Sequence, residues 1–171
     1  MSQDERAREA LRARVAALYE ESRGDVFHYL LTLGLGPAQA QEAAQEVFVR
    51  LYATLRRGEE IERPRAWIFR VAHNLGLKLR TRESPLTQFA PGAAELLPSI
   101  SDDPERELLE RERMSRFQAA MGELSERQRS CLLLRLEGLR YPEIGAALGI
   151  SASAAGEFLR RAIERIRKYV L

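Results

Sequence analysis

Residues 83–104, ESPLTQFAPGAAELLPSISDDP, constrain the fold more than any other stretch of the sequence. The segment contains four prolines, has no regular apolar spacing and ends in acidic residues, a composition typical of linkers. On both sides of it, apolar residues recur at the spacing of amphipathic helices. The sequence therefore predicts an all-α protein with two small helical domains, residues 5–83 and 105–171, joined by a flexible linker over residues 84–104.

The first domain is expected to contain three helices. Apolar residues at helical spacing run from Leu11 to Leu33, Gly34 and Gly36 then end the first helix, and Pro37 begins the second. A turn over residues 56–64 leads into a third helix over residues 64–82. Each of the last two helices has an apolar stripe that we expect to be buried: Ala44, Val47, Phe48, Leu51 and Leu55 in the second, and Ile68, Val71, Ala72, Leu75 and Leu79 in the third.

The second domain ends in a helix-turn-helix pattern. Ser125 and Gln128 have capping-box spacing at the start of one helix, and Gly138 closes it. A short helix follows, YPEIGAALG, and after a turn at Gly149 the final helix is capped by Ser151. Two helices joined by a tight glycine-containing turn are typical of DNA-binding domains. The expected buried stripe of the final helix is Ala155, Phe158, Leu159, Ala162, Ile166 and Val170.

Catalytic and metal-binding motifs are absent from the sequence. His28 and His73 lie in different helices without neighbouring cysteines, and no HExxH, CxxC, GxSxG or phosphate-binding glycine loop occurs. We therefore expect no enzyme, no metal and no cofactor. The single cysteine, Cys131, excludes an intramolecular disulfide and suits a reducing compartment. No signal peptide or membrane-spanning run is visible, so the expected location is the cytoplasm, without membrane association.

The charge is unevenly distributed, although the net charge is only +2. Residues 64–82 contain five lysines and arginines, two large aromatics and no acid. On a helical wheel Trp67, Arg70, Asn74 and Lys78 share the face opposite the apolar stripe. Cations can contact phosphates, and an aromatic ring can stack on an unpaired base for roughly 1–3 kcal/mol. This face predicts binding to single-stranded nucleic acid. The alternative is that Trp67 and Phe69 pack against a neighbouring helix while the cations are only solvated.

Three motifs in order carry a family resemblance. PRAWIFRVAHN, preceded by AAQEVFVRLY and followed by LSERQRSCLLLRLEGLRYPEIGAALGIS, resembles the bacterial extracytoplasmic-function (ECF) sigma factors, the small two-domain initiation subunits of RNA polymerase. The resemblance extends over residues 10–170. It implies core RNA polymerase and promoter DNA as partners. An anti-sigma protein often holds members of this family inactive, so such a partner is a further expectation.

The resemblance also assigns roles to residues. It implies that the second helix binds the polymerase and that the third captures a flipped base of the minus-ten element and keeps the strands open. The polymerase-binding residues implied are Glu42, Gln45, Glu46, Arg50 and Tyr52. The DNA-binding residues expected are Arg65, Trp67, Arg70, Asn74, Lys78, Arg80 and Arg82 in the third helix, and Ser151, Ser153, Glu157, Arg160, Arg161 and Arg165 around the final helix.

The final helix departs from the family pattern. Where the family usually has lysine, serine and arginine, this chain has Gly156, Glu157 and Phe158. An outward acid repels phosphates, although it can accept a hydrogen bond from cytosine. We therefore expect Arg160, Arg161 and Arg165 to contact phosphates with little sequence discrimination. Two alternatives stay open: a regulator that uses only its helix-turn-helix, and a protein-interaction module that has lost promoter recognition.

Overall fold

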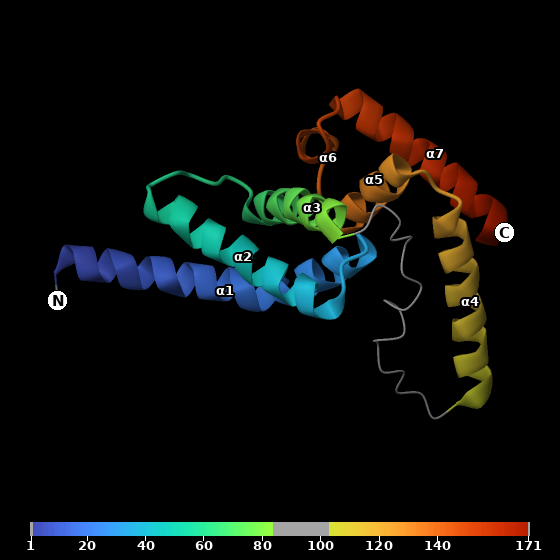
Figure 1. Cartoon of the computed structure of the whole chain (residues 1–171), viewed down its shortest axis with the longest axis horizontal. Coiled ribbons are helices and arrows are strands. Elements are labelled where there is room, and N and C mark those ends of the chain that lie inside the picture. Colours follow the sequence, from blue (N-terminus) through green and yellow to red (C-terminus); the bar gives the residue numbers. More distant parts are fainter. Residues whose placement is uncertain (1, 84–102, 171) are drawn as a thin grey trace. The chain divides into compact units, whose positions relative to one another are not determined.

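The computed structural model describes residues 2–83 and 103–170, and these residues form helices and turns with no strand (Figure 1). The predicted all-α class is confirmed, and the chain divides into two compact units. The predicted linker, residues 84–104, lies outside the described residues except at its last two positions. The first unit contains α1 (Gln3–Thr32), α2 (Pro37–Arg56) and α3 (Pro64–Glu83), and the second contains α4 (Pro104–Gly122), α5 (Glu126–Leu136), α6 (Tyr141–Leu148) and α7 (Ala152–Val170).

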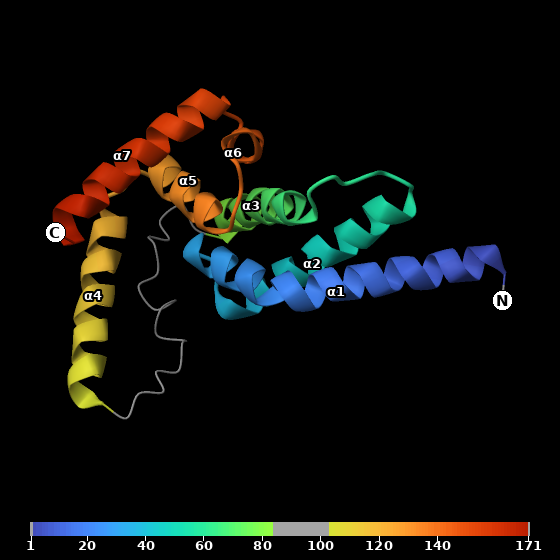
Figure 2. The ribbon, with the colours of Figure 1, turned by 180° about the vertical axis from the view of Figure 1, so that it is seen from behind.

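The first unit is built from α1, α2 and α3. Both views show α1 and α2 side by side (Figures 1 and 2), and α3 packs against each of them. The chain reverses at Gly34, whose φ of 98° lies in the left-handed region that glycine enters without strain. Pro37 then occupies the first turn of α2, where the missing N–H costs no helical hydrogen bond. The side chains of Val26, Leu30, Val47, Leu51, Ile68 and Ala72 are fully buried between the three helices.

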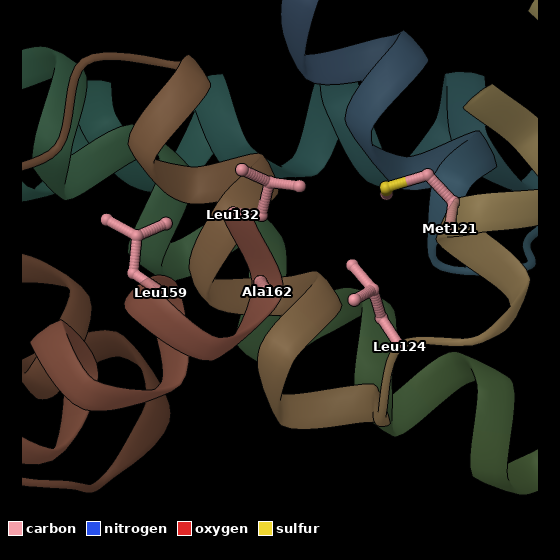
Figure 3. Packing of buried hydrophobic residues seen from close by; sticks show 5 residues of the cluster. All are labelled: Met121, Leu124, Leu132, Leu159 and Ala162. Carbon is pink, nitrogen blue, oxygen red and sulfur yellow. The ribbon is translucent and has the colours of Figure 1, made fainter. Parts of the chain in front are cut away.

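The second unit has its own core, to which α7 contributes a buried stripe (Figure 3). The predicted capping box is present, because Ser125 Oγ accepts from the Gln128 amide at 3.2 Å and Gln128 Oε1 accepts from the Ser125 amide at 3.0 Å. Of the stripe predicted in the final helix, Phe158 and Ile166 are only half-buried, and the side chain of Val170 lies outside the described part. The core residues shown are Met121, Leu124, Leu132, Leu159 and Ala162.

A close backbone approach fixes the turn between α6 and α7. Gly149, with φ 67°, ends α6 in the left-handed conformation, and its N–H donates to the carbonyl oxygen of Gly145. A Cβ atom on Gly145 would lie 2.6 Å from the carbonyl oxygen of Ile150, so only glycine fits there. Ser151 Oγ accepts from the Ala154 amide at 3.0 Å and caps α7 as predicted. The turn therefore positions the start of α7 through backbone contacts.

Candidate functional site

The outer face of α3 carries four of the side chains predicted to meet DNA. Arg70, Asn74 and Lys78 are exposed, and Trp67 is half-buried on the same side of the helix. Most of the opposite side is core, since Ile68 and Ala72 are fully buried there. Val71 and Leu79 of the predicted buried stripe are only half-buried, so that prediction was wrong for these two residues. The predicted division of α3 into a core face and an outer face is therefore present, with the indole partly covered and partly open to a ligand.

The second aromatic of this segment has a different place. Phe69 is fully buried and meets the Tyr29 ring edge-on, with centroids 5.5 Å apart. One turn further along, the buried His73 lies with Nδ1 2.7 Å from the Tyr29 hydroxyl. These contacts fix α3 against α1. The alternative of packing against a neighbouring helix thus applies to Phe69, while Trp67 keeps an exposed part.

Two of the cations predicted on α3 make contacts inside the unit. Arg65 Nη2 donates to Asp25 Oδ2 at 2.9 Å, and its guanidinium lies 5.0 Å from the centre of the Phe69 ring. Arg80 is half-buried, with Nη1 3.5 Å from the carbonyl oxygen of Leu33. The side chain of Arg82 lies outside the described part. Arg65 and Arg80 therefore help to hold α3 in position, which sequence reasoning did not foresee.

The polar face of α2 carries the residues assigned to polymerase binding. Glu42, Gln45 and Arg50 are exposed, whereas Glu46 and Tyr52 are half-buried. Arg50 Nε donates to Glu46 Oε1 at 2.8 Å across one helical turn. Both side chains of this pair remain about half exposed, so another protein can reach them. All five predicted residues therefore have solvent-accessible surface on α2.

Beside this face, α1 and α2 enclose an open hollow of about 350 Å³. The Tyr19 ring meets Phe48 edge-on at 5.0 Å, and the Arg23 guanidinium lies 5.5 Å from the Tyr19 ring centre. Sequence reasoning did not single out these α1 residues, although Tyr19 follows Val15 and Leu18 of the apolar stripe. The lining consists of Tyr19, Arg23, Gly24, Phe27, Gln41, Ala44 and Gln45.

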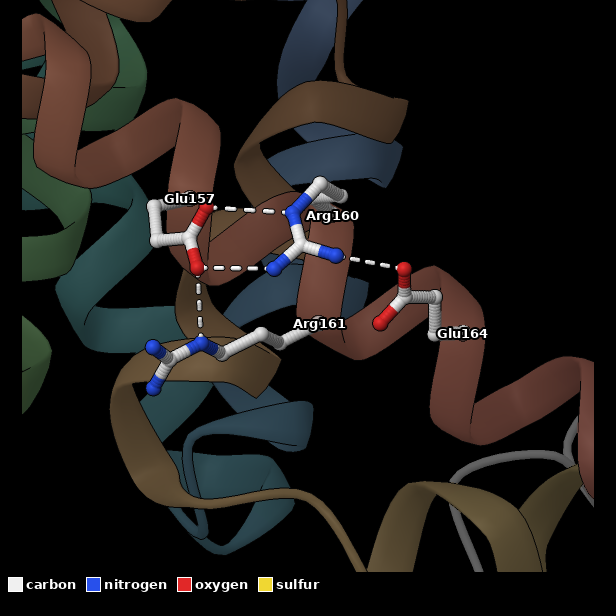
Figure 4. A network of polar contacts seen from close by, with 4 residues as sticks. All are labelled: Glu157, Arg160, Arg161 and Glu164. Atoms are coloured by element: carbon white, nitrogen blue, oxygen red, sulfur yellow. Dashed lines mark hydrogen bonds and ion pairs between the residues drawn. The ribbon is translucent and has the colours of Figure 1, made fainter.

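On α7, the acid that departs from the family pattern is paired with two arginines (Figure 4). Glu157 accepts from Arg160 Nε at 3.1 Å, from Arg160 Nη2 at 2.8 Å and from Arg161 Nε at 2.8 Å. Arg160 Nη1 donates to Glu164 as well. The hydrogen bonds from Arg160 and Arg161 lower the pKa of Glu157 to about 2, so this carboxylate stays ionised at neutral pH. Arg160 and Arg161 are therefore not free cations.

The remaining predicted residues of this unit differ in accessibility. Ser151 uses its hydroxyl to cap α7, and Ser153 is exposed one position into the helix. Arg165 Nη1 donates to the carbonyl oxygen of Glu123 at 2.7 Å, which ties α7 to the end of α4. Arg165 thus has a structural contact in addition to its exposed surface.

Within residues 2–83 and 103–170, no three or more histidine, cysteine, aspartate or glutamate side chains are grouped to hold a metal ion. In the same ranges, no helix is both long and apolar enough to span a membrane.

Each of the two units matches a different family model. Residues 18–85 match the model described as Sigma-70 region 2, and residues 114–166 match the model described as Sigma-70, region 4. The two ranges cover α2, α3, α5, α6 and most of α7. They contain the predicted polymerase-binding and DNA-binding residues.

Two curated relatives are described as ECF RNA polymerase sigma factors. The chain is 26% identical over 133 residues to the ECF RNA polymerase sigma factor SigE of Mycolicibacterium smegmatis; the match covers 77% of this chain and 51% of that protein. It is 24% identical over 156 residues to the ECF RNA polymerase sigma factor SigK of Mycobacterium sp. (strain KMS), covering 89% and 80%. The chain therefore spans about half the length of the first of these relatives.

A solved structure shares the fold. The structure of CnrH in complex with the cytosolic domain of CnrY superposes with a TM-score of 0.63 at 19% identity, and the match covers 95% of this chain and 91% of that one.

Proposed function

The chain belongs to the sigma-70 family, as a factor of the ECF type, and from this premise we propose that it binds core RNA polymerase, recognises promoter DNA and opens its strands at initiation. The observation that carries the proposal is the two-sided α3. Phe69 and His73 hold its inner face to α1, and Arg70, Asn74 and Lys78 lie outward beside the half-buried Trp67.

Strand opening requires a surface that offers both an accessible aromatic ring and cations, as the outer face of α3 does. Separating a duplex exposes unpaired bases and two charged backbones, and unstacking costs a few kcal/mol per step. An aromatic ring can stack on an unpaired base while cations contact the phosphates. Because the inner face of α3 is fixed by buried contacts, its outer side chains require no rearrangement of the helix to meet the strand.

Polymerase binding is assigned to the polar face of α2. Its acceptors, Gln45 and Glu46, are accessible, and Glu46 is oriented by Arg50. A complementary basic surface on the polymerase would compete with Arg50 for the same carboxylate. The roles of Glu42 and Tyr52 at the ends of this face belong to the same proposal.

Upstream promoter DNA is assigned to the helix-turn-helix formed by α6 and α7. The start of α7 is held by the turn at Gly145 and by the Ser151 cap, so Ser153 and the charged face beyond it have a defined orientation. In this motif the second helix enters the major groove.

The proposal also covers catalysis, the cellular compartment and a third partner. We assign no catalysis to the chain, because RNA synthesis belongs to the polymerase that it would direct. The cytoplasm follows as its compartment, since its proposed partners are polymerase and promoter DNA. The solved CnrH structure includes the cytosolic domain of CnrY, and for this chain an anti-sigma protein is the third partner that we propose.

A second function is favoured by one observation. Arg160 and Arg161, in the middle of α7, are paired with Glu157 and Glu164, which reduces the positive charge offered to DNA. A chain with such a helix could bind polymerase without selecting promoters, acting as a protein-interaction module.

Transcription from purified components separates the two functions. Core polymerase is incubated with and without the full-length chain on a pool of genomic fragments, and the transcript ends are sequenced. An initiation factor yields transcripts from a subset of fragments only when the chain is present. Polymerase binding without new transcripts would leave the interaction module as the function.

A further inference from the structure

Four charged side chains form one network on the exposed face of α7: Glu157, Arg160, Arg161 and Glu164 (Figure 4). They lie three or four residues apart and therefore share a side of the helix. The other side of α7 is buried through Ala155, Leu159 and Ala162. Two carboxylates balance two guanidinium groups, so this part of the helix presents no net charge to a phosphate backbone.

Within the network, each of the three nitrogens of Arg160 donates one hydrogen bond. Its Nε and Nη2 donate as a fork to the two oxygens of Glu157, at 3.1 Å and 2.8 Å, and its Nη1 donates to Glu164. Fork contacts of this kind combine two charge-assisted hydrogen bonds and fix the guanidinium plane. Only one N–H on each terminal nitrogen of Arg160 remains for a further acceptor, and both carboxylates hold the group in place.

Arg161 is anchored at one point only. Its Nε donates to Glu157 Oε1 at 2.8 Å, and within the described part of the chain its Nη1 and Nη2 make no hydrogen bond. Figure 4 shows these two nitrogens directed away from the carboxylate. The side chain is 58% exposed. This single hydrogen bond restricts the rotation of the guanidinium group. It leaves the two terminal nitrogens available to donate along one edge of the group.

Most of the acceptor capacity of Glu157 is used by arginine, since Oε1 accepts two hydrogen bonds and Oε2 accepts one. Only Oε2 can still accept from a cytosine amino group, and its bond to Arg160 fixes its direction. The carboxylate is therefore better suited to orienting Arg161 than to contacting a base. An edge with two donors matches guanine, whose O6 and N7 are both acceptors in the major groove.

We propose that Glu157 is a positioning residue that holds the terminal nitrogens of Arg161 toward the major groove, where Arg161 recognises one guanine of the upstream promoter element. Arg160 stays bound to Glu157 and Glu164. The inference rests on the proposed function, in which α7 meets promoter DNA. It replaces the expectation that Arg160 and Arg161 both contact phosphates without discriminating sequence.

A matched pair of variants tests the role of Glu157. Glu157→Gln and Glu164→Gln each remove one negative charge from the same face, but only Glu157→Gln replaces the charged acceptor of Arg161 with a neutral amide and so weakens its anchor. The full-length parent and variants are each used to select from a pool of short randomised DNA duplexes, and the bound fraction is sequenced. The parent and Glu164→Gln should enrich guanine at one position. Glu157→Gln should reduce that preference about tenfold or more.

Arg161→Lys is the second test, because it keeps the charge but replaces the planar pair of donors with a flexible ammonium group. It should weaken the guanine preference while keeping most of its affinity for arbitrary duplexes. The inference is overturned if the parent selects no guanine, if Arg161→Lys retains the preference, or if Glu157→Gln and Glu164→Gln behave alike. Transcription by the parent with core polymerase is measured in parallel. Initiation without a guanine preference overturns this inference alone, whereas a guanine preference without initiation overturns the proposed function.

Discussion

A Cβ atom on Gly145 would lie 2.6 Å from the carbonyl oxygen of Ile150, across the turn that joins α6 to α7. The atom that it would strike belongs to the backbone, so no side chain can move aside. Gly156 in α7 is different, since its Cβ would lie 3.4 Å from two carbons of the Tyr141 ring, an ordinary contact distance. The two glycines therefore predict opposite effects of the same substitution.

Gly145→Ala should destabilise the second unit, because the turn must open to admit the methyl group. Gly156→Ala should stabilise α7 by up to about 1 kcal/mol, because alanine has the higher helix propensity. Amide hydrogen exchange in α6 and α7 of the full-length chain measures both effects. Faster exchange in Gly156→Ala, or unchanged exchange in Gly145→Ala, would contradict this reading of the turn.

Phe69→Ala and Trp67→Ala should separate packing from DNA binding on α3. Phe69 is fully buried against Tyr29, so its truncation should cost about 3–5 kcal/mol of unfolding free energy. Trp67→Ala should keep the fold and polymerase binding but lose transcription from duplex promoters. A template with a pre-opened mismatched bubble should restore its transcription, since the strands then need no opening.

The bubble template decides the role of Trp67. If Trp67→Ala transcribes duplex templates as well as the parent does, the indole is a packing residue. If the bubble gives no recovery, the defect lies in another step. Unfolding of the variant by circular dichroism provides the fold control.

Glu46→Lys should weaken polymerase binding while leaving the first unit folded. The substitution breaks an exposed pair with Arg50, which is worth little to stability, and reverses the charge of the proposed polymerase-binding face. The matched control is Glu110→Lys, which disrupts a similarly exposed pair with Arg106 one helical turn away in α4. Both affinities are measured by titration of core polymerase. If Glu46→Lys and Glu110→Lys lose the same polymerase affinity, α2 is not the polymerase-binding helix.

Cys131 should react slowly with thiol reagents in the folded chain. It is fully buried, and burial raises the pKa of its thiol to about 11, with a smaller opposing effect of Arg127. The unfolded thiol titrates at about 9, so the stability that the neutral thiol contributes is complete below pH 9 and is lost as pH rises toward 11. Ser153→Cys, at an exposed position, is the fast-reacting control. Rapid labelling of Cys131 under native conditions would contradict its burial.

Much of the fold was predictable because glycine, proline and capping residues set the helix ends. Pro37 begins α2, the Ser125 and Gln128 box begins α5, and Gly149 ends α6, each through local backbone chemistry. Helical spacing likewise separated the buried stripe of α3 from its outer face.

Contacts between distant segments were not predictable. Arg65 lies on the predicted basic segment, but its partner Asp25 is 40 residues earlier, and nothing in the local sequence links them. For the same reason the pattern did not reveal that Phe69 packs against Tyr29. The ion pairs around Glu157 could have been predicted from the sequence, since Arg160, Arg161 and Glu164 follow at the three- and four-residue spacings that favour ion pairs.

Strand opening distinguishes an initiation factor from a module that only binds polymerase, and permanganate mapping of unpaired thymines detects it on the promoter itself. Core polymerase is incubated on duplex fragments that yield chain-dependent transcripts, with and without the full-length chain, and reactive thymines are mapped. Reactive thymines should occur just upstream of the transcription start only when the chain is present. Thymines that remain unreactive with the chain bound to polymerase, or that react equally without it, would show that the chain does not open the strands.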